Sequence, residues 1–401
     1  MQRAFGVGLT VNRHAGANVH LHVGRVSAEE PRIGDSTGYL EEVMALPLLA
    51  AQGSGMQAFM GTIMTLSTDP HDIIFIDEPE AFLHPPQARL LGEVVVEMTR
   101  DNGPQVIAAT HSSDFLQGVL NAAKSTADVS VVRVTRPSSS ENRVAQVEPS
   151  LLASLYKDPL LRHSKILDGI FYKGVVLCEA ESDCTYYSVT LAHLEDTQGL
   201  SASDILFAQC GGKDRLKKAY EALTAAGVPT AVIADVDILA DRSKFEALFG
   251  ALGGETEDVA TDYSVVSASV SNRAVRPRRA LAVAQVDLVL KEGSGEYLST
   301  SETRAIAEVL RSESGWKRLK NSGVRGVDNG APSTALSSIL EKSARVGLFI
   351  VPVGELERFH PTVSGNKQEW LRQVLEQELY AEETEAHSLL LKVREFIAAS
   401  Q

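Results

Sequence analysis

Short apolar runs that end abruptly on carboxylates recur along this chain. The clearest two are residues 174–183 (GVVLCEAESD) and 231–237 (AVIADVD), both rich in β-branched side chains. Runs of this length and composition are typical of parallel strands that are buried on both faces. Because the carboxyl ends of such strands meet at one edge of the sheet, we expect the acidic residues that end both runs to lie together. These residues are Glu179, Asp183, Asp235 and Asp237.

The grouping of these four carboxylates predicts a cation site. Asp235 and Asp237 are two residues apart, so on a strand both side chains would point to the same face. Four carboxylates at one sheet edge repel one another unless a cation neutralises them. The ligands are hard oxygens, with no His or Cys among them, and this favours Mg²⁺ or Mn²⁺.

The rest of the second half continues the alternation of strands and helices. Further apolar runs at residues 205–210 and 346–353 predict two more strands, and segments of helical period separate the runs. Residues 255–345 are mostly helical and interrupt the alternation as an insertion. We therefore predict an α/β fold with a mainly parallel, Rossmann-like sheet over residues 169–401.

The first half predicts a separate α/β domain over residues 1–168. Strand segments and a helix from about residue 38 precede two strands, at residues 73–76 and 105–109. We place the domain boundary near residues 167–172. The elements expected before that boundary are a helix, a strand at 129–135, a polar loop at 137–140 and a helical connector.

Composition and charge narrow the class of protein. The 401 residues include 44% hydrophobic and 22% charged residues, enough for two or three domains with buried cores. The net charge of -14 argues against a surface that coats DNA non-specifically, although a local basic groove would suffice for a nucleic-acid substrate. The three cysteines show no metal-binding spacing, no apolar run is long enough for a membrane span, and the N-terminus lacks the apolar region of a signal peptide. We therefore predict a cytoplasmic protein with no membrane segment.

Two strand ends in the first half carry polar residues in a specific order. Residues 73–85 (IIFIDEPEAFLHP) place Asp77 and Glu78 at the end of one strand. His111 stands at the end of the next, in QVIAATHS. Ordinary strands with polar ends would fit each run alone, but their joint spacing resembles the second half of an ABC-type ATPase head.

This resemblance implies a role for each residue. Asp77 would be the Walker B aspartate that orients Mg²⁺, Glu78 the base that activates water, and His111 the switch histidine that senses the γ-phosphate. Ser54 and Gly55, in a glycine-serine turn that opens a helix, would belong to the signature loop, which reads ATP bound to the partner protomer. Without the resemblance, the same turn is an ordinary helix cap whose N–H groups could bind phosphate.

One part of that ATPase head is absent from the sequence. No GxxxxGK[ST] phosphate loop occurs, and the nearest run fails because Phe207 replaces the first glycine and Asp214 follows Lys213. We expect the chain to begin downstream of the P-loop, as a fragment, a mis-started reading frame or one half of a split ATPase. ATP would then bind only if a P-loop is supplied upstream or in trans.

The carboxylates of the second half resemble the motif pair of the TOPRIM fold, in which a Glu-x₃-Asp strand end precedes an Asp-x-Asp strand end. An ABC-type head followed by TOPRIM resembles the OLD (overcoming lysogenization defect) family of nucleases. The strand end GELE at residues 354–357 and the position of Lys367 also match that family. Ala180 is a departure, because a glycine usually follows the first glutamate; alanine would strain the turn if the position requires positive φ.

The resemblance implies phosphodiester hydrolysis at two divalent cations, Mg²⁺ or Mn²⁺. The residues implied for one cation are Glu179, Asp235 and Asp237. Asp183 and Glu357 would bind the second cation, and Lys367 would neutralise charge in the transition state. Glu181 and Glu355 would face away or support these ligands. The family also implies a DNA substrate, a homodimer or higher oligomer built through the ATPase-like half, a role in phage defence and a separate defence-system partner.

Other functions fit parts of the pattern. A topoisomerase would need a tyrosine-bearing cleavage domain and a bacterial primase a zinc module, and neither is visible. An ATP-dependent DNA-repair or regulatory ATPase could use its TOPRIM domain only for binding, and an interaction subunit could be inactive in both halves. Trp316 and two basic clusters could contact nucleic acid, or they could be a packing anchor and a solvated face. The clusters are Arg273, Arg276, Arg278 and Arg279, and Lys317, Arg318, Lys320 and Arg325.

Overall fold

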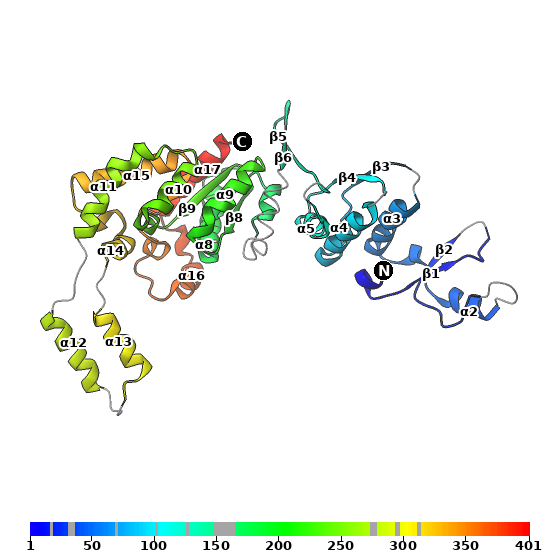
Figure 1. Ribbon diagram of the computed structural model, residues 1–401, viewed down its shortest axis with the longest axis horizontal. Coiled ribbons are helices and arrows are strands. Elements are labelled where there is room, and N and C mark those ends of the chain that lie inside the picture. Colours follow the sequence, from blue (N-terminus) through cyan, green and yellow to red (C-terminus); the bar gives the residue numbers. More distant parts are fainter. Residues whose placement is uncertain are drawn as a thin grey trace. The chain divides into compact units, whose positions relative to one another are not determined.

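The computed structural model divides into two compact units, Met1–Val131 and Val132–Gln401, and Figure 1 labels many of their helices and strands. The predicted boundary near residues 167–172 lies inside the second of these units, so the limits 1–168 and 169–401 stay a prediction. The predicted connector before residue 165 and three arginines of the first basic cluster lie outside the described residues. The structure describes residues 1–16, 19–30, 37–68, 71–100, 103–125, 128–147, 165–272, 279–292, 297–310 and 314–401.

Unit 1 combines helices with two strand pairs. Its elements are α1 (Gln2–Phe5), β1 (Leu9–Asn12), β2 (His20–Val23), α2 (Thr37–Ala45), η1 (Leu49–Ala51), α3 (Ser54–Thr68), β3 (Ile73–Asp77), α4 (Pro85–Thr99), β4 (Gln105–Ala109) and α5 (Ser113–Ala122). β1 and β2 pair antiparallel, whereas β3 and β4 pair in parallel, with Ile73 opposite Gln105 and Asp77 opposite Ala109. Helix α4 is the crossover that a parallel pair requires. The two predicted strands and the helix after the glycine-serine turn are confirmed.

The core of unit 1 covers one face of the β3–β4 pair. Phe59 of α3 and Leu91 of α4 are buried in one cluster with Ile74. On the other face, Phe75 is 75% exposed and Ile107 is also exposed. Among the residues that the structure describes, the β3–β4 pair is therefore covered on one face only. An apolar run predicts a strand that can be buried, but its burial depends on a second layer of structure.

Unit 2 is built around a four-stranded parallel sheet. Its elements are β5 (Val131–Ser138), β6 (Glu141–Val147), η2 (Leu167–Phe171), β7 (Gly174–Cys178), α8 (Glu181–Thr197), β8 (Ile205–Gln209), η3 (Lys213–Arg215), α9 (Leu216–Ala225), β9 (Thr230–Ala234), η4 (Val236–Ala240), α10 (Arg242–Ala251), α11 (Thr256–Asn272), α12 (Arg279–Glu292), α13 (Thr300–Leu310), α14 (Gly315–Ser322), η5 (Gly323–Gly326), α15 (Ala331–Arg345), β10 (Leu348–Ile350), η6 (Leu356–Phe359), α16 (Lys367–Glu376), η7 (Leu379–Ala381) and α17 (Glu385–Ala399).

The strand order of this sheet determines where a site can form. The order is β10-β9-β7-β8, and every pairing is parallel. β8 lies on one side of β7 and β9 on the other, so the chain leaves β7 first in one direction and then in the opposite one. Ligands of open α/β sheets bind at such a switch point, outside the carboxyl ends of the strands. The fold therefore directs attention to the ends of β7 and β9.

Helices cover this sheet on both faces (Figure 1). α8 and α17 pack against β7 and contribute to one hydrophobic cluster, which contains the buried rings of Tyr186 and Trp370. α9 packs against β7 and β9. Every residue of β7 and β9 is buried. This two-sided burial explains why both strands read as continuous apolar runs rather than alternating ones.

The predicted helical insertion is confirmed and comprises α11 to α15, which precede β10. α11 packs against α14 and α15, while α12 and α13 pack on each other. Trp316 of α14 stacks on Tyr263 of α11 with ring centroids 6.4 Å apart, as a packing anchor would. No helix among the described residues combines the length and the apolar composition needed to cross a membrane.

The segment before β7 differs from the prediction. Of the polar loop expected at residues 137–140, residues 137 and 138 belong to β5 and residues 139–140 form the tight turn of a hairpin, because β6 pairs with β5. Arg133 of β5 anchors this hairpin by donating to three backbone carbonyls, those of Ile170 at 2.9 Å, Tyr172 at 2.8 Å and Gly227 at 2.6 Å. The sequence of β6, ENRVAQV, is polar and lacks the apolar run by which the other strands were predicted.

Candidate metal centre

Three carboxylates from two neighbouring strand ends converge at the switch point of the sheet. Glu179 directly follows β7, and Asp235 and Asp237 follow β9. One side-chain oxygen of each lies within 4.8 Å of the others. In the described ranges, this is the one group of three or more acidic, His or Cys side chains arranged to hold a metal ion. Three of the predicted ligands thus lie together.

The backbone that brings the two aspartates together is not the predicted one. β9 ends at Ala234, Asp235 is the extended N-cap residue of η4, and Asp237 lies in the first turn of that helix. The prediction that both lie on a strand is therefore wrong. A 3₁₀ turn brings their oxygens together instead, and apolar periodicity does not show where a strand gives way to such a turn.

Asp183 takes a different partner from the other three carboxylates. It lies in the first turn of α8, where its Oδ2 accepts a hydrogen bond from the Ala180 N–H at 3.0 Å. Its Oδ1 lies 2.6 Å from the Nζ of Lys367, the first residue of α16. Ala180 has an extended backbone with φ −136°, so alanine at this position causes no strain.

The third strand end, after β10, contributes acids outside the group of three. Glu357 lies in η6, and the Oε1 of Glu355 lies 3.4 Å from the Nε of Arg358. Burial first, and the nearby Glu357 second, raise the pKa of Glu355. The pairing of Asp183 with Glu357 around a second cation stays a prediction.

Two lysines contact the three-carboxylate group directly. The Lys320 Nζ lies 3.0 Å from Asp235 Oδ2 and 3.3 Å from Asp237 Oδ2. The Lys213 Nζ lies 3.4 Å from the same Asp237 Oδ2. Lys320 belongs to the predicted second basic cluster, and Lys213 to the run that imitates a phosphate loop. Both residues were visible in the sequence, but only the fold shows that they point at the acids.

Burial and mutual repulsion dominate the electrostatics of this group. Burial, followed by repulsion from Asp235 and Asp237, raises the pKa of Glu179 to about 7. Burial also raises the pKa of Asp235, which is 7% exposed, although the ammonium groups of Lys320 and Lys367 oppose this shift. The site therefore holds more negative charge than its lysines neutralise.

The oxygen atoms of this group fit a divalent cation. Glu179 Oε1 and Asp237 Oδ1 are buried and accept no hydrogen bond from any residue that the structure describes. A buried carboxylate oxygen without a partner is costly unless a proton or a cation satisfies it. Three hard oxygen donors with no sulfur or imidazole suit ions such as Mg²⁺ or Mn²⁺.

The residues predicted for a nucleotide site also lie at strand ends, in unit 1. Asp77 ends β3, and the next residue, Glu78, has a left-handed backbone with φ 46°. The Nδ1 of His111, which follows β4, lies 3.6 Å from Glu78 Oε1. Ser54 and Gly55 begin α3. A Cβ at Gly55 would collide with the backbone carbonyl of Phe82, in the loop after β3. The predicted signature turn therefore lies next to the predicted Walker B segment.

Glu80 is a residue of this site that sequence reasoning missed. It is 8% exposed, and its Oε1 accepts hydrogen bonds from Thr110 Oγ1 at 2.8 Å and from the His111 N–H at 3.3 Å. It therefore braces the loop after β3 against the end of β4. Its place in EPEAFLHP offers no signal for this role, because a glutamate so close to a strand end reads as a solvated loop residue.

Comparison with known proteins matches both halves. Residues 42–116 match the family model of an AAA domain described as a putative AbiEii toxin of a type IV TA system. Residues 170–237 match the model of an overcoming lysogenization defect protein-like TOPRIM domain. An AAA-domain match followed by an OLD-like TOPRIM match is the domain order that the sequence predicts. The TOPRIM match includes all three carboxylates of the group described above.

The chain is also similar to a curated nuclease. The chain is 29% identical over 177 residues to the Old nuclease of Escherichia phage P2, a match that covers 44% of this chain and 29% of the phage protein. The match thus spans less than a third of the length of that relative. A solved chain described under "Structural biochemistry of ATP-driven dimerization and DNA stimulated activation of SMC ATPases" is 9% identical, with a TM-score of 0.26. The matched region covers 39% of this chain and 83% of the solved chain.

Proposed function

We propose that this OLD-type chain is a divalent-metal-dependent DNA endonuclease whose TOPRIM half hydrolyses phosphodiester bonds. The observation that supports the proposal is the convergence of Glu179, Asp235 and Asp237, with two buried oxygens left without partners, at the switch point of a TOPRIM sheet. The relative from phage P2 is named a nuclease, which agrees with this reaction class.

The chemistry of the site fits the demands of phosphodiester hydrolysis. Such a reaction needs an activated water, neutralised phosphate charge and a stabilised leaving 3′-oxygen, and divalent cations supply these when bound. Glu179, Asp235 and Asp237 would hold one Mg²⁺ or Mn²⁺. Asp183 and Glu357 are the candidates for a second. Lys367 would place a fixed positive charge beside the phosphate, where it stabilises the transition state more than the ground state.

The ATPase-like half is proposed to regulate or dimerise the nuclease. Asp77, Glu78 and His111 have the order of a Walker B and switch segment, and Ser54 with Gly55 that of a signature turn. ATP would be bound if a phosphate loop is supplied upstream or in trans. We extend the family's properties to this chain as proposals: a cytoplasmic homodimer or higher oligomer, a role in phage defence and a separate defence-system partner.

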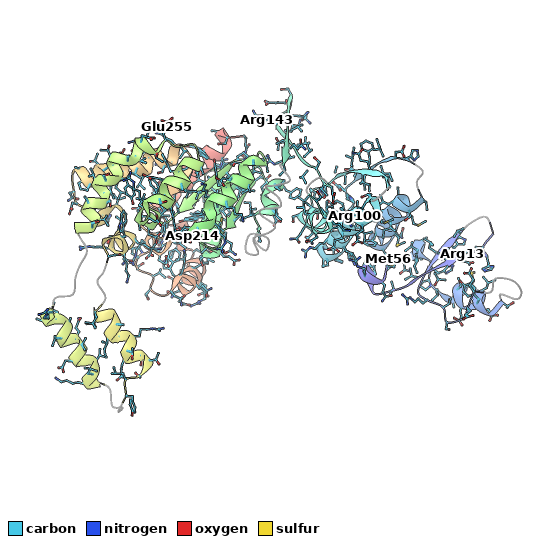
Figure 2. All side chains as sticks on the ribbon, viewed as in Figure 1. Arg13, Met56, Arg100, Arg143, Asp214 and Glu255 are labelled. Carbon is cyan, nitrogen blue, oxygen red and sulfur yellow. The ribbon has the colours of Figure 1, made fainter. Side chains whose placement is uncertain are left out.

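Plasmid nicking tests this proposal. Purified protein with Mg²⁺ or Mn²⁺ should convert supercoiled plasmid to nicked or linear forms, and EDTA should stop the reaction. Asp235→Asn should lower the cleavage rate by more than roughly 100-fold. Mutating a residue that only supports a metal ligand already costs about 10- to 100-fold, and this variant alters a ligand itself. Asp214→Asn is the matched control: this exposed acid, labelled in Figure 2, pairs with Lys244 at 2.6 Å and is not among the three carboxylates. Cleavage that survives in Asp235→Asn would refute the assignment.

A DNA-binding regulator that does not cut DNA is the second candidate. The contacts of Lys213 and Lys320 with Asp237 favour it, because they neutralise part of the charge that would attract a cation. Wild-type protein that binds DNA in a gel-shift assay, yet cleaves none with either metal, would support this alternative.

A further inference from the structure

Lys320 belongs to the carboxylate group although it comes from a distant part of the chain. Its ammonium bridges Oδ2 of Asp235 and Oδ2 of Asp237, whereas Lys213 contacts Asp237 alone. Its side chain is half-buried, and it lies on α14, the helical insertion's last helix before η5 and α15. The neighbouring basic residues of the same cluster, such as Lys317, are exposed.

The backbone around α14 holds Lys320 in this place. Gly354, in the turn after β10, has φ 110°, and a Cβ there would collide with the Lys320 carbonyl. The carbonyl of the same Gly354 accepts a hydrogen bond from the Val236 N–H at 2.9 Å, between the two aspartates. In η5, directly after α14, the Val324 N–H donates to the Pro352 carbonyl at 3.0 Å. One turn of backbone therefore links Lys320 to the segment whose carboxylates it neutralises.

The contacts divide the carboxylate oxygens into two sets. Lys320 and Lys213 take the Oδ2 atoms, while Asp237 Oδ1 and Glu179 Oε1 stay buried without partners. Lys320 thus fixes the orientation of the aspartates and leaves their other oxygens for a cation. Its positive charge also repels that cation, and at partly buried sites this repulsion is weakly screened.

We propose that Lys320 is the resident cation of the metal centre: it stabilises the carboxylate group in the metal-free protein and lowers the affinity of the site for divalent ions. It is a positioning residue, and because α14 carries it, the docking of the insertion sets metal affinity. The proposal rests on the metal centre of the proposed function. Since it concerns binding, it can be tested without DNA cleavage.

Mn²⁺ titration of four proteins tests this inference. The proteins are wild type, Lys320→Met, Lys320→Arg and Lys317→Met, the last being the same charge change at an exposed position of the same helix. Binding is measured by calorimetry and by the electron paramagnetic resonance signal of free Mn²⁺, and melting temperature is measured in EDTA. Lys320→Met should bind Mn²⁺ at least tenfold more tightly and melt several degrees lower without metal, because the buried Asp235 and the partly buried Asp237 lose their counter-ion. Lys320→Arg should have a Kd for Mn²⁺ and a melting temperature near those of the wild type. Lys317→Met should change the Kd less than twofold.

The outcomes separate this inference from the proposed function. If folded Lys320→Met binds Mn²⁺ with an unchanged or higher Kd, Lys320 is not a resident cation, and the metal centre stands on wild-type binding that Asp235→Asn abolishes. Binding by Lys320→Met alone supports the inference in its strongest form. If neither wild type nor Lys320→Met binds Mn²⁺, the inference and the metal centre both fail.

Discussion

At the scale of single residues, the site depends on how burial acts on Glu179. Its side chain follows a strand that is buried on both faces, and it has no hydrogen-bonding partner for Oε1 among the described residues. The same carboxylate that would bind a cation therefore destabilises the folded protein when no metal is bound. Sites built for charged ligands commonly store instability of this kind.

Measuring the free energy of unfolding as a function of pH tests whether Glu179 destabilises the metal-free protein. Glu179 has a pKa of about 7 in the folded protein, above its ordinary value of 4.5 in an unfolded chain. The folded state therefore binds the proton more tightly than the unfolded state. The contribution of Glu179 to the free energy of unfolding is complete below pH 4.5 and is lost as the pH rises through 7. Glu179→Gln should stabilise the metal-free protein at pH 8 by at most about 3 kcal/mol, with little effect at pH 5.

Urea unfolding in EDTA at both pH values gives these differences directly. Glu181→Gln, two residues further on at an exposed position, is the control. An effect of Glu179→Gln that is equal at pH 5 and pH 8 would show that ionisation is not its cause.

At the scale of elements, the four strands of the parallel sheet in unit 2 could be predicted from the sequence, but the turns that follow them could not. β7, β9 and β10 are continuous apolar runs because both of their faces are covered. Burial of this kind can be predicted from the residue types alone. The position of Asp235 and Asp237 in η4 depends instead on where β9 stops, and the adjacent valine and aspartate residues fit either state. The candidate ligands were therefore predictable from their order, whereas the geometry that joins them was not.

The hairpin of β5 and β6 shows an anchor that no pattern predicted. Arg133 donates to three backbone carbonyls of unit 2, and without it these acceptors would need water. Arg133→Ala should destabilise unit 2 by about 2 kcal/mol, the loss expected for charged donors to partly buried carbonyls. Thermal unfolding compared with Arg136→Ala, an exposed arginine of the same strand, isolates this effect. A variant as stable as wild type would mean that water replaces the guanidinium at no cost.

At the scale of the whole molecule, the chain has two units with different chemistry. The three-carboxylate group lies in unit 2, whereas unit 1 carries the residues that the sequence predicts for a nucleotide site. The exposed apolar face of β3 and β4 was not predictable, because an apolar run reports what a strand could bury rather than what covers it. Lys320 was unpredictable for the same reason, since its place beside the acids is created by the fold of a distant insertion.

Two units should unfold separately in calorimetry, and divalent ions should move only one transition. Binding at 100 times the Kd stabilises a fold by about 2.7 kcal/mol, which corresponds to a shift of about 5 °C for the transition of unit 2. The transition of unit 1 should stay in place, and Asp235→Asn should abolish the shift. Movement of both transitions together would indicate that the units unfold cooperatively or that each binds metal.

The insertion between β9 and β10 has a consequence for the order of folding. β7, β8 and β9 are joined by short connections, whereas β10 pairs with β9 only after α10 to α15 have intervened. Closing so long a loop costs entropy before any contact repays it, so the local strands form first and β10 joins late. Asp235 and Asp237 would thus emerge during synthesis well before Lys320 and Gly354, and during that interval Lys213, which precedes them in the chain, would be the lysine available to neutralise Asp237.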